Sequence, residues 1–121
     1  VLVMDDEEIV RMVAGELIRS LGHEAEFAEH GDAAIEKYKQ AKAEGRPFDV
    51  VILDLTIRGG KGGEETLREL LEIDPGVKAV VSSGYSDDEV VATYRQHGFR
   101  FFLKKPYSIG ELRMMLDDVM A

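Results

Sequence analysis

The stretch from Phe48 to Leu55 most constrains what this chain can fold into, because its apolar residues follow one another without alternation and stop at Asp54. An uninterrupted run rich in Val and Ile predicts a strand that is buried on both faces of a sheet. Asp is rare inside strands and costly to bury, so Asp54 is expected where this strand leaves the sheet. Ligands of open parallel sheets gather beyond the carboxyl ends of the strands, which makes Asp54 the first candidate for chemistry.

Strand and helix patterns alternate along the whole chain. The predicted strands cover residues 1–4, 24–28, 48–55, 77–81 and 99–103. Apolar residues at helical spacing follow each strand. The first four helices are expected to end near Gly22, Gly45, Asp74 and Gly98. Ser86 with Glu89, and Ser108 with Glu111, have the spacing of a capping box, which predicts where the last two helices begin. This alternation predicts parallel βαβ units with right-handed crossovers, and therefore a three-layer α/β domain.

Length and composition narrow the class of protein. A chain of 121 residues is long enough for one domain with a core and too short for two, so residues 1–121 are expected to be a single domain. It begins at Val1 inside an apolar run, which suggests a piece of a longer protein. The net charge of −9 opposes direct binding to nucleic acid or anionic lipid. The chain has no Cys and no run of apolar residues long enough for a membrane helix, so a cytoplasmic location is expected.

Polar side chains follow four of the five predicted strands. Asp5 and Asp6 follow the first strand, Asp54 the third, Ser83 the fourth and Lys105 the fifth. Because parallel strands end on the same side of a sheet, these groups are expected to converge. Clustered carboxylates repel one another unless a cation lies among them, and oxygen ligands without His or Cys suit Mg²⁺. A metal, a carboxylate nucleophile, a hydroxyl and an ammonium together predict a phosphoryl-transfer site.

Each of these motifs also has a simpler interpretation. Asp5 and Asp6 alone would most often cap the first helix and complement its dipole. Ser83 followed by Gly84 is usually a polar turn, and Lys105 next to another Lys is usually solvated. Their placement at the ends of four different strands is what favours a common site.

Over essentially its whole length the chain resembles the receiver domain of two-component response regulators. The motifs that carry the resemblance are Asp5-Asp6, Asp54, Ser83-Gly84 and Lys105-Pro106, each after its own strand. The resemblance implies a flavodoxin-like (βα)5 fold, with helices on both faces of a five-stranded parallel sheet of order 2-1-3-4-5. It also implies a bacterial signalling domain that catalyses its own phosphorylation and dephosphorylation, and no enzyme acting on a separate substrate.

The resemblance implies roles for the acidic residues. Asp54 would accept a phosphoryl group from the phosphohistidine of a sensor histidine kinase or a histidine phosphotransfer protein. Asp6 and Asp54 would bind Mg²⁺ directly and Asp5 through water, while the backbone carbonyl of Thr56 would complete the protein ligands. Mn²⁺ could take the place of Mg²⁺.

The resemblance also implies how phosphorylation would change the surface of the domain. Lys105 would pair with a phosphoryl oxygen, and its peptide bond to Pro106 would be cis. Ser83 would move toward the phosphoryl group and Phe102 would follow, which would change the surface of the fourth helix, fifth strand and fifth helix. A homodimer could form through that surface. The side chains of Thr56 and Tyr85 would tune the lifetime of the phosphoryl group.

The chain departs from the family pattern in three places. Arg58 stands where the family usually has Pro, inside a loop with four Gly, which puts the rigidity of that loop in doubt. Arg58 could instead reach a partner or the phosphoryl group. The hydroxyl residue is Ser83 where Thr is common, and Phe102 lacks a phenolic hydroxyl. The Gly-rich loop and the sequence around Ser83 are most similar to receivers fused to hybrid sensor histidine kinases.

Three other functions fit parts of the pattern. A magnesium-dependent phosphatase of the dehalogenase-like class also uses an Asp at a strand end, but it needs a second Asp where Thr56 stands. A flavin-binding domain of the same fold needs a phosphate loop after the first strand, where the acidic run that starts at Asp5 would repel a phosphate. A degenerate receiver would act only as a binding module.

Overall fold

Five parallel strands form the single sheet of the computed structural model, which describes residues 1–84 and 88–121. The strands are β1 (Leu2–Met4), β2 (Glu26–Ala28), β3 (Val51–Asp54), β4 (Ala79–Ser83) and β5 (Phe101–Lys104). Their order is β2-β1-β3-β4-β5, which confirms the flavodoxin-like topology expected from the sequence. Every residue of β3 and β4 is buried, as an unalternating apolar run predicts for central strands.

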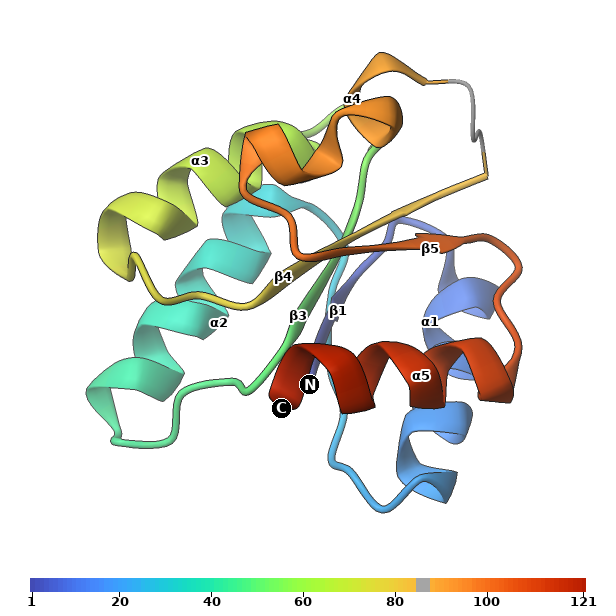
Figure 1. Ribbon diagram of the computed structural model, residues 1–121. Helices are drawn as coiled ribbons and strands as arrows, with labels where there is room; N and C mark the ends of the chain where they lie inside the picture. The colour runs from blue at the N-terminus through green and yellow to red at the C-terminus, as the bar shows by residue number, and fades with distance from the viewer. Residues whose placement is uncertain (85–87) are drawn as a thin grey trace.

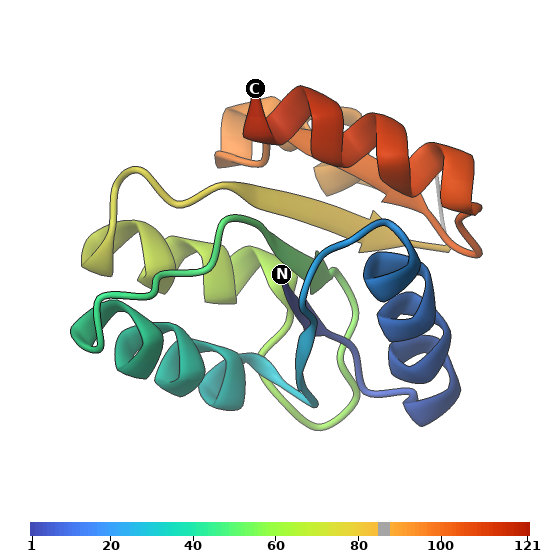
Figure 2. The ribbon, with the colours of Figure 1, turned by 90° about the horizontal axis from the view of Figure 1, so that it is seen from below.

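Helices cover both faces of the sheet (Figures 1 and 2). They are α1 (Glu8–Ser20), α2 (Gly31–Ala43), α3 (Gly63–Ile73), α4 (Glu89–Ala92) and α5 (Ile109–Met120), with the 3₁₀ helix η1 (Tyr94–His97) after α4. In the views of Figures 1 and 2, α1 and α5 lie on one face, and α2 and α3 lie on the other. Among the helices of the described ranges, none has the length and apolar character that crossing a membrane requires.

Alternate residues of each strand supply two separate cores. One core joins Val3, Ile52 and Val80 to buried residues of α1 and α5. The other joins Leu53 and Val81 to buried residues of α2 and α3. Successive strand side chains point to opposite faces, so a sheet covered on both sides needs apolar residues at every position. The short strands therefore satisfy two layers of helices at once.

The fourth helix differs from the expected one. The sequence predicts one helix that opens at Ser86 and runs to Gly98, but Ser86 lies outside the described residues. The side chain of Asp88 accepts a hydrogen bond from the Val90 amide at 2.8 Å and caps α4, which begins at Glu89. The Thr93 hydroxyl donates to the Glu89 carbonyl at 2.9 Å, a local bond that bends helices, and the α-helix stops there.

The end of this segment and the start of the last helix lie where the sequence predicts them. The 3₁₀ turn η1 continues the chain to Gly98, whose positive φ of 99° ends it at the predicted place. A full capping box between Ser108 and Glu111 opens α5, which confirms the predicted start of the last helix.

A hydrogen bond between α2 and the end of α3 generates a prediction about stability. The side chain of Tyr38 is 1% exposed, and its hydroxyl donates to Oδ2 of Asp74 at 2.6 Å. Tyr38→Phe should lower the free energy of unfolding by about 1 kcal/mol, because it removes a bond to a charged acceptor while the ring stays packed. Urea unfolding measures the change. Tyr94→Phe is the matched control, since the Tyr94 hydroxyl has no hydrogen bond within the described residues. Equal unfolding midpoints for Tyr38→Phe and wild type would contradict the prediction.

Candidate functional site

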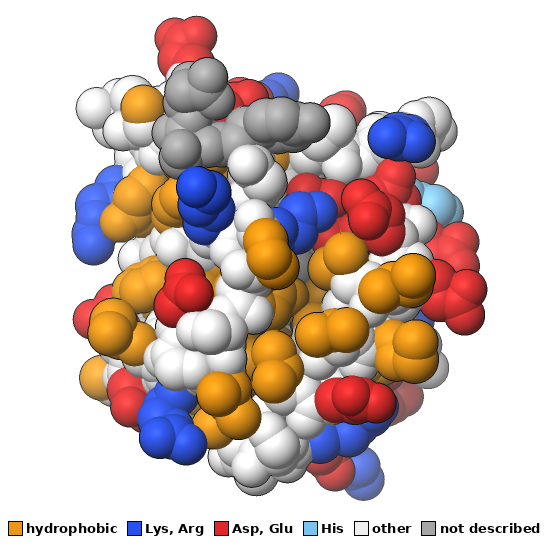
Figure 3. Space-filling view, turned by 90° about the vertical axis from the view of Figure 1, so that its right-hand side faces the viewer, with side chains coloured by type: hydrophobic (Ala, Val, Ile, Leu, Met, Phe, Trp, Pro, Cys, Tyr) orange, Lys and Arg blue, Asp and Glu red, His pale blue; other side chains and the backbone are white. Residues whose placement is uncertain are grey.

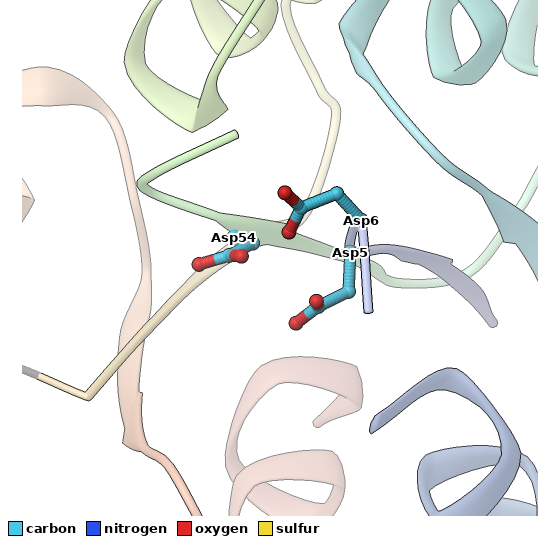
Figure 4. A group of neighbouring side chains, drawn as sticks. All are labelled: Asp5, Asp6 and Asp54. Atoms are coloured by element: carbon cyan, nitrogen blue, oxygen red, sulfur yellow. The ribbon is translucent and has the colours of Figure 1, made fainter. Parts of the chain in front are cut away.

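The ends of β1 and β3 bring three carboxylates together. Asp5 and Asp6 directly follow β1, and Asp54 is the last residue of β3. One oxygen from each of the three lies within 4.8 Å of the others. Figure 4 shows their carboxyl groups gathered beyond the ends of the two strands. The predicted convergence of the acids is therefore present in the structure.

Backbone groups hold each carboxylate in place. Asp5 is 2% exposed, and its Oδ1 accepts a hydrogen bond from the Glu7 amide at 2.9 Å. Oδ2 of Asp6 accepts from the Arg58 amide at 3.2 Å. Asp54 is 3% exposed, and its Oδ1 accepts a long bond of 3.4 Å from the Thr56 amide. The loop after β3 thus contacts two of the three acids through its main chain.

The side chain of Lys105 joins two of the acids. Its Nζ lies 3.0 Å from Oδ2 of Asp5 and 3.2 Å from Oδ2 of Asp54. Lys105 follows β5 immediately, and the Lys105–Pro106 peptide bond, for which the resemblance implies the cis form, is cis. One ammonium against three carboxylates leaves the site with a negative charge of the kind that a divalent cation balances.

Burial and charge shift the ionisation of this group. The pKa of Asp54 is raised to about 6, because burial and, second, the neighbouring Asp5 raise it by more than the Lys105 ammonium lowers it. Burial lowers the pKa of Lys105, but Asp54 and Asp5 together outweigh that effect and raise it. Asp54 is therefore the carboxylate that is most costly to keep ionised without a further cation.

These residues open into a cavity of about 300 Å³. Its lining consists of Asp6, Glu7, Asp54, Thr56, Arg58, Ser83, Gly84 and Lys105. Ser83, the buried last residue of β4, is thus brought to the acids as predicted, and Thr56 lies exposed at the rim. Tyr85 lies outside the described residues.

Phe102 lies on β5 beside the predicted hydroxyl residue. Val81 pairs with Phe102 in the sheet, and Ser83 pairs with Lys104. Two positions along a strand share a face, so Ser83 and Phe102 are on the same side of the sheet. Phe102 is half-buried against the core that α2 and α3 cover.

The Gly-rich loop between β3 and α3 is anchored by contacts that were not predicted from the sequence. The carbonyl of Lys61 accepts a hydrogen bond from the Gly31 amide at 2.9 Å, and its ammonium pairs with Asp32 at 2.9 Å and with Glu69. Hydrogen bonds to Glu69 and Asp32 raise the pKa of Lys61. A Cβ on Gly62 would lie 2.6 Å from the Leu55 carbonyl oxygen, so the loop packs tightly there. The loop is therefore held to both α2 and α3.

The donor set fits a hard divalent cation. Three carboxylates within 4.8 Å offer oxygen ligands alone, and neither His nor Cys belongs to the cluster found among the described residues. Mg²⁺ and Mn²⁺ prefer such ligands. The site can thus hold a metal next to a nearly buried carboxylate and an ammonium.

The raised pKa of Asp54 predicts a pH-dependent effect of Asp54→Asn. The folded-state pKa of about 6 lies above the ordinary 3.8, so folding takes up a proton between these pH values. The free energy of unfolding therefore falls as pH rises through this window and stays lower above it. Without divalent cations, Asp54→Asn should be more stable than wild type at pH 7, on the order of 1–3 kcal/mol.

Urea unfolding in a chelator, from pH 4 to pH 8, tests this expectation. The gain should shrink toward pH 4, where the Asp54 carboxyl of the folded wild type is protonated. Asp117→Asn, at an exposed position on α5, is the matched control and should show no such gain. A less stable Asp54→Asn at pH 7 would show that burial does not govern this carboxyl.

Several known proteins have sequences or structures similar to this chain. The chemotaxis protein CheY of Thermotoga maritima is 32% identical over 120 residues, which cover 98% of this chain and 95% of that protein. The sensor kinase CckA of Brucella abortus is 28% identical over 120 residues, which cover 99% of this chain and 12% of that protein. The crystal structure of the NtrX receiver domain from Brucella abortus has a TM-score of 0.84 at 26% identity, and covers 98% of this chain and 96% of that chain.

A sequence like this one therefore makes up nearly all of one relative and a small part of another. The family model described as the response regulator receiver domain matches residues 1–117. The motifs at the four strand ends lie within that match. The chain belongs to the family of response regulator receiver domains.

Proposed function

We propose that this chain, as a single receiver domain over residues 1–121, accepts a phosphoryl group on Asp54 and thereby carries a two-component signal. The observation that carries the proposal is the setting of Asp54, a nearly buried carboxylate 3.2 Å from the Lys105 ammonium in a cavity that Ser83 also lines. The donor is the phosphohistidine of a sensor histidine kinase or of a histidine phosphotransfer protein.

The acids would hold the metal that this chemistry uses. Asp6 and Asp54 would bind Mg²⁺ directly, Asp5 through water, and the Thr56 carbonyl would complete the protein ligands. Mn²⁺ could replace it. When bound, the cation neutralises the oxygens of the phosphoryl group during transfer. The oxygen-only donor set supports this assignment.

The transfer step needs little from the protein beyond positioning and charge. An oxygen of Asp54 attacks phosphorus, the bond from phosphorus to the imidazole nitrogen of the donor breaks, and its electron pair stays on that nitrogen. The product is an acyl phosphate on Asp54. The Lys105 ammonium, which already contacts Oδ2 of Asp54, would bind a phosphoryl oxygen of the product. Hydrolysis of the acyl phosphate returns the carboxylate and inorganic phosphate.

A change at Ser83 would pass the signal to the surface. The hydroxyl of Ser83 would move toward the phosphoryl group, and Phe102, on the same side of the sheet, would follow. This movement would favour one of two states of the surface made by α4, β5 and α5, where a partner or a second copy could bind. Thr56 and Tyr85 would tune the lifetime of the acyl phosphate.

An apolar groove beside the cavity suits the donor protein. It holds about 340 Å³, and its lining is Glu7, Ile9, Val10, Val13, Ala14, Lys105, Pro106 and Tyr107. Ile9 is 71% exposed and Val13 is 48% exposed, both on α1. Figure 3 shows hydrophobic side chains gathered on this end of the molecule. Because Lys105 lines both the groove and the cavity, a helix seated in the groove would hold its phosphohistidine near Asp54.

Intact mass after incubation with acetyl phosphate tests the acceptor. Wild type in Mg²⁺ should gain the mass of one phosphoryl group, and the gain should disappear in a chelator. Asp54→Asn should gain nothing, because its amide is no nucleophile for phosphorus. Labelling of Asp54→Asn as complete as that of wild type would exclude Asp54 as the acceptor. Absence of labelling in wild type would favour a degenerate receiver that acts as a binding module.

The groove is tested by comparing two donors. Val13→Glu places a charge in an apolar contact, so transfer from a phosphorylated histidine phosphotransfer protein should slow by roughly tenfold or more. The histidine phosphotransfer protein chosen as donor is the one in a panel that phosphorylates wild type fastest. Labelling by acetyl phosphate should be unchanged, because that donor needs no groove. Glu16→Gln, also exposed on α1, is the control. Equal slowing with both donors would place the defect at the acceptor and contradict the docking role.

A further inference from the structure

Arg58 stands at the acceptor cavity with an uncommitted charge. Its amide donates to Oδ2 of Asp6 at 3.2 Å, which fixes its main chain at the edge of the cavity that it lines. The residue is exposed, and among the contacts within residues 1–84 and 88–121 its guanidinium has no hydrogen bond or ion pair. By contrast, the guanidinium of Arg11 donates to the Asp5 carbonyl and lies near Glu29. Arg58 is thus a cation that the resting fold does not use.

The charges in the cavity explain what such a cation can do. The Lys105 ammonium is already shared between Asp5 and Asp54. A phosphoryl group on Asp54 would replace the single carboxylate charge with up to two charges and would add three acceptor oxygens. A guanidinium is a planar fork that binds two oxygens of a phosphoryl group at once. The site therefore holds more negative charge during transfer than at rest, and a second cation would neutralise part of it.

The loop holds Arg58 ready for this contact. Lys61, three residues further on, pairs with Asp32 and Glu69 and accepts from the Gly31 amide. With the main chain fixed on both sides, only the side-chain rotamers of Arg58 remain to be ordered when an anion binds. The cost of this ordering is comparable to one charge-assisted hydrogen bond, and the two bonds that a guanidinium fork makes would exceed it.

We propose that the Arg58 guanidinium binds the phosphoryl oxygens of the incoming donor and favours donors with the greater net negative charge. The inference rests on the proposed function of Asp54. With acetyl phosphate, an oxygen of Asp54 attacks phosphorus, the bond from phosphorus to the acetyl oxygen breaks, and acetate leaves with the electron pair. Arg58 contacts the transferred oxygens and takes no part in bond making. It acts beside Lys105, from the loop that follows β3 at the same edge of the sheet.

The test compares two small donors on variants of one residue. Arg58→Met keeps the length of the side chain without its charge, and Arg58→Lys keeps the charge. Initial rates of phosphorylation are measured against the concentration of two donors near neutral pH. Acetyl phosphate is a dianion there, whereas phosphoramidate has a protonated nitrogen that lowers its net charge and repels a neighbouring cation. Arg58→Met should raise the half-saturating concentration of acetyl phosphate roughly tenfold, change that of phosphoramidate much less, and leave the maximal rate nearly unchanged. Arg58→Lys should restore only part of the loss, because it keeps the charge without the planar fork.

Controls separate binding of the donor from indirect effects. Arg100→Met removes an exposed Arg at the start of β5, at the other end of the sheet, and should leave both donors unaffected. Isothermal titration with Mg²⁺ should give the same affinity for Arg58→Met and wild type, because the backbone bond to Asp6 is retained.

Three results would overturn the inference. Wild-type saturation curves in Arg58→Met would show that the side chain does not contact the donor, and would leave a protein partner as its use. An equal loss with both donors, together with weaker Mg²⁺ binding, would show that residue 58 acts only through Asp6. If neither donor labels wild type, the proposed function of Asp54 fails together with the inference. In the first two results wild type is labelled, so only the inference fails.

Discussion

Repulsion among carboxylates at one edge of the sheet is the constraint on which the rest of this site depends. Asp5 and Asp54 are both almost fully buried, and the ammonium between them belongs to Lys105, 100 positions away from Asp5. Parallel strands are what bring such distant residues to a common edge. The backbone amides of Glu7, Thr56 and Arg58 orient the acids without adding a full charge. The remaining negative charge keeps the site receptive to a cation, which in turn would attract the phosphoryl group of the proposed reaction.

The sheet separates the acceptor from the residues that would report on it. Asp54 pairs with Ser82 in the sheet, and Ser83 is the next residue, so its side chain points to the opposite face. That face also carries Phe102, and its core is built with α2 and α3. A hydroxyl drawn toward Asp54 would therefore move across the plane of the sheet at its carboxyl edge. Space on the far face would then open for Phe102, which makes the coupling a matter of packing volume as much as of charge.

The sequence predicted the features that depend on burial and on strand order. The unbroken apolar run up to Asp54 required two covered faces, and polar residues at four strand ends required a common edge. Features that depend on contacts between distant residues were not predictable. The anchoring of the Gly-rich loop is one of these, because Lys61 meets acids on two helices and no local pattern reveals that pairing. The break in the fourth helix coincides instead with a local bond of the Thr93 hydroxyl, which spacing does not distinguish from a hydroxyl turned to solvent.

The anchoring of the loop has a consequence for the environment in which the site works. A Pro in this loop would stiffen the main chain through its ring. Here Lys61 holds the loop instead, through ion pairs to the solvent-accessible side chains of Asp32 and Glu69. Ion pairs of this kind weaken as dissolved salt screens them, whereas the apolar cores on the two faces of the sheet do not. The side of the site that β3 supplies is thereby tied to ionic strength. The Lys105 ion pairs at the end of β5 reach carboxylates that are almost fully buried, so salt screens them less, and the loop is the part of the cavity that ionic strength would affect most.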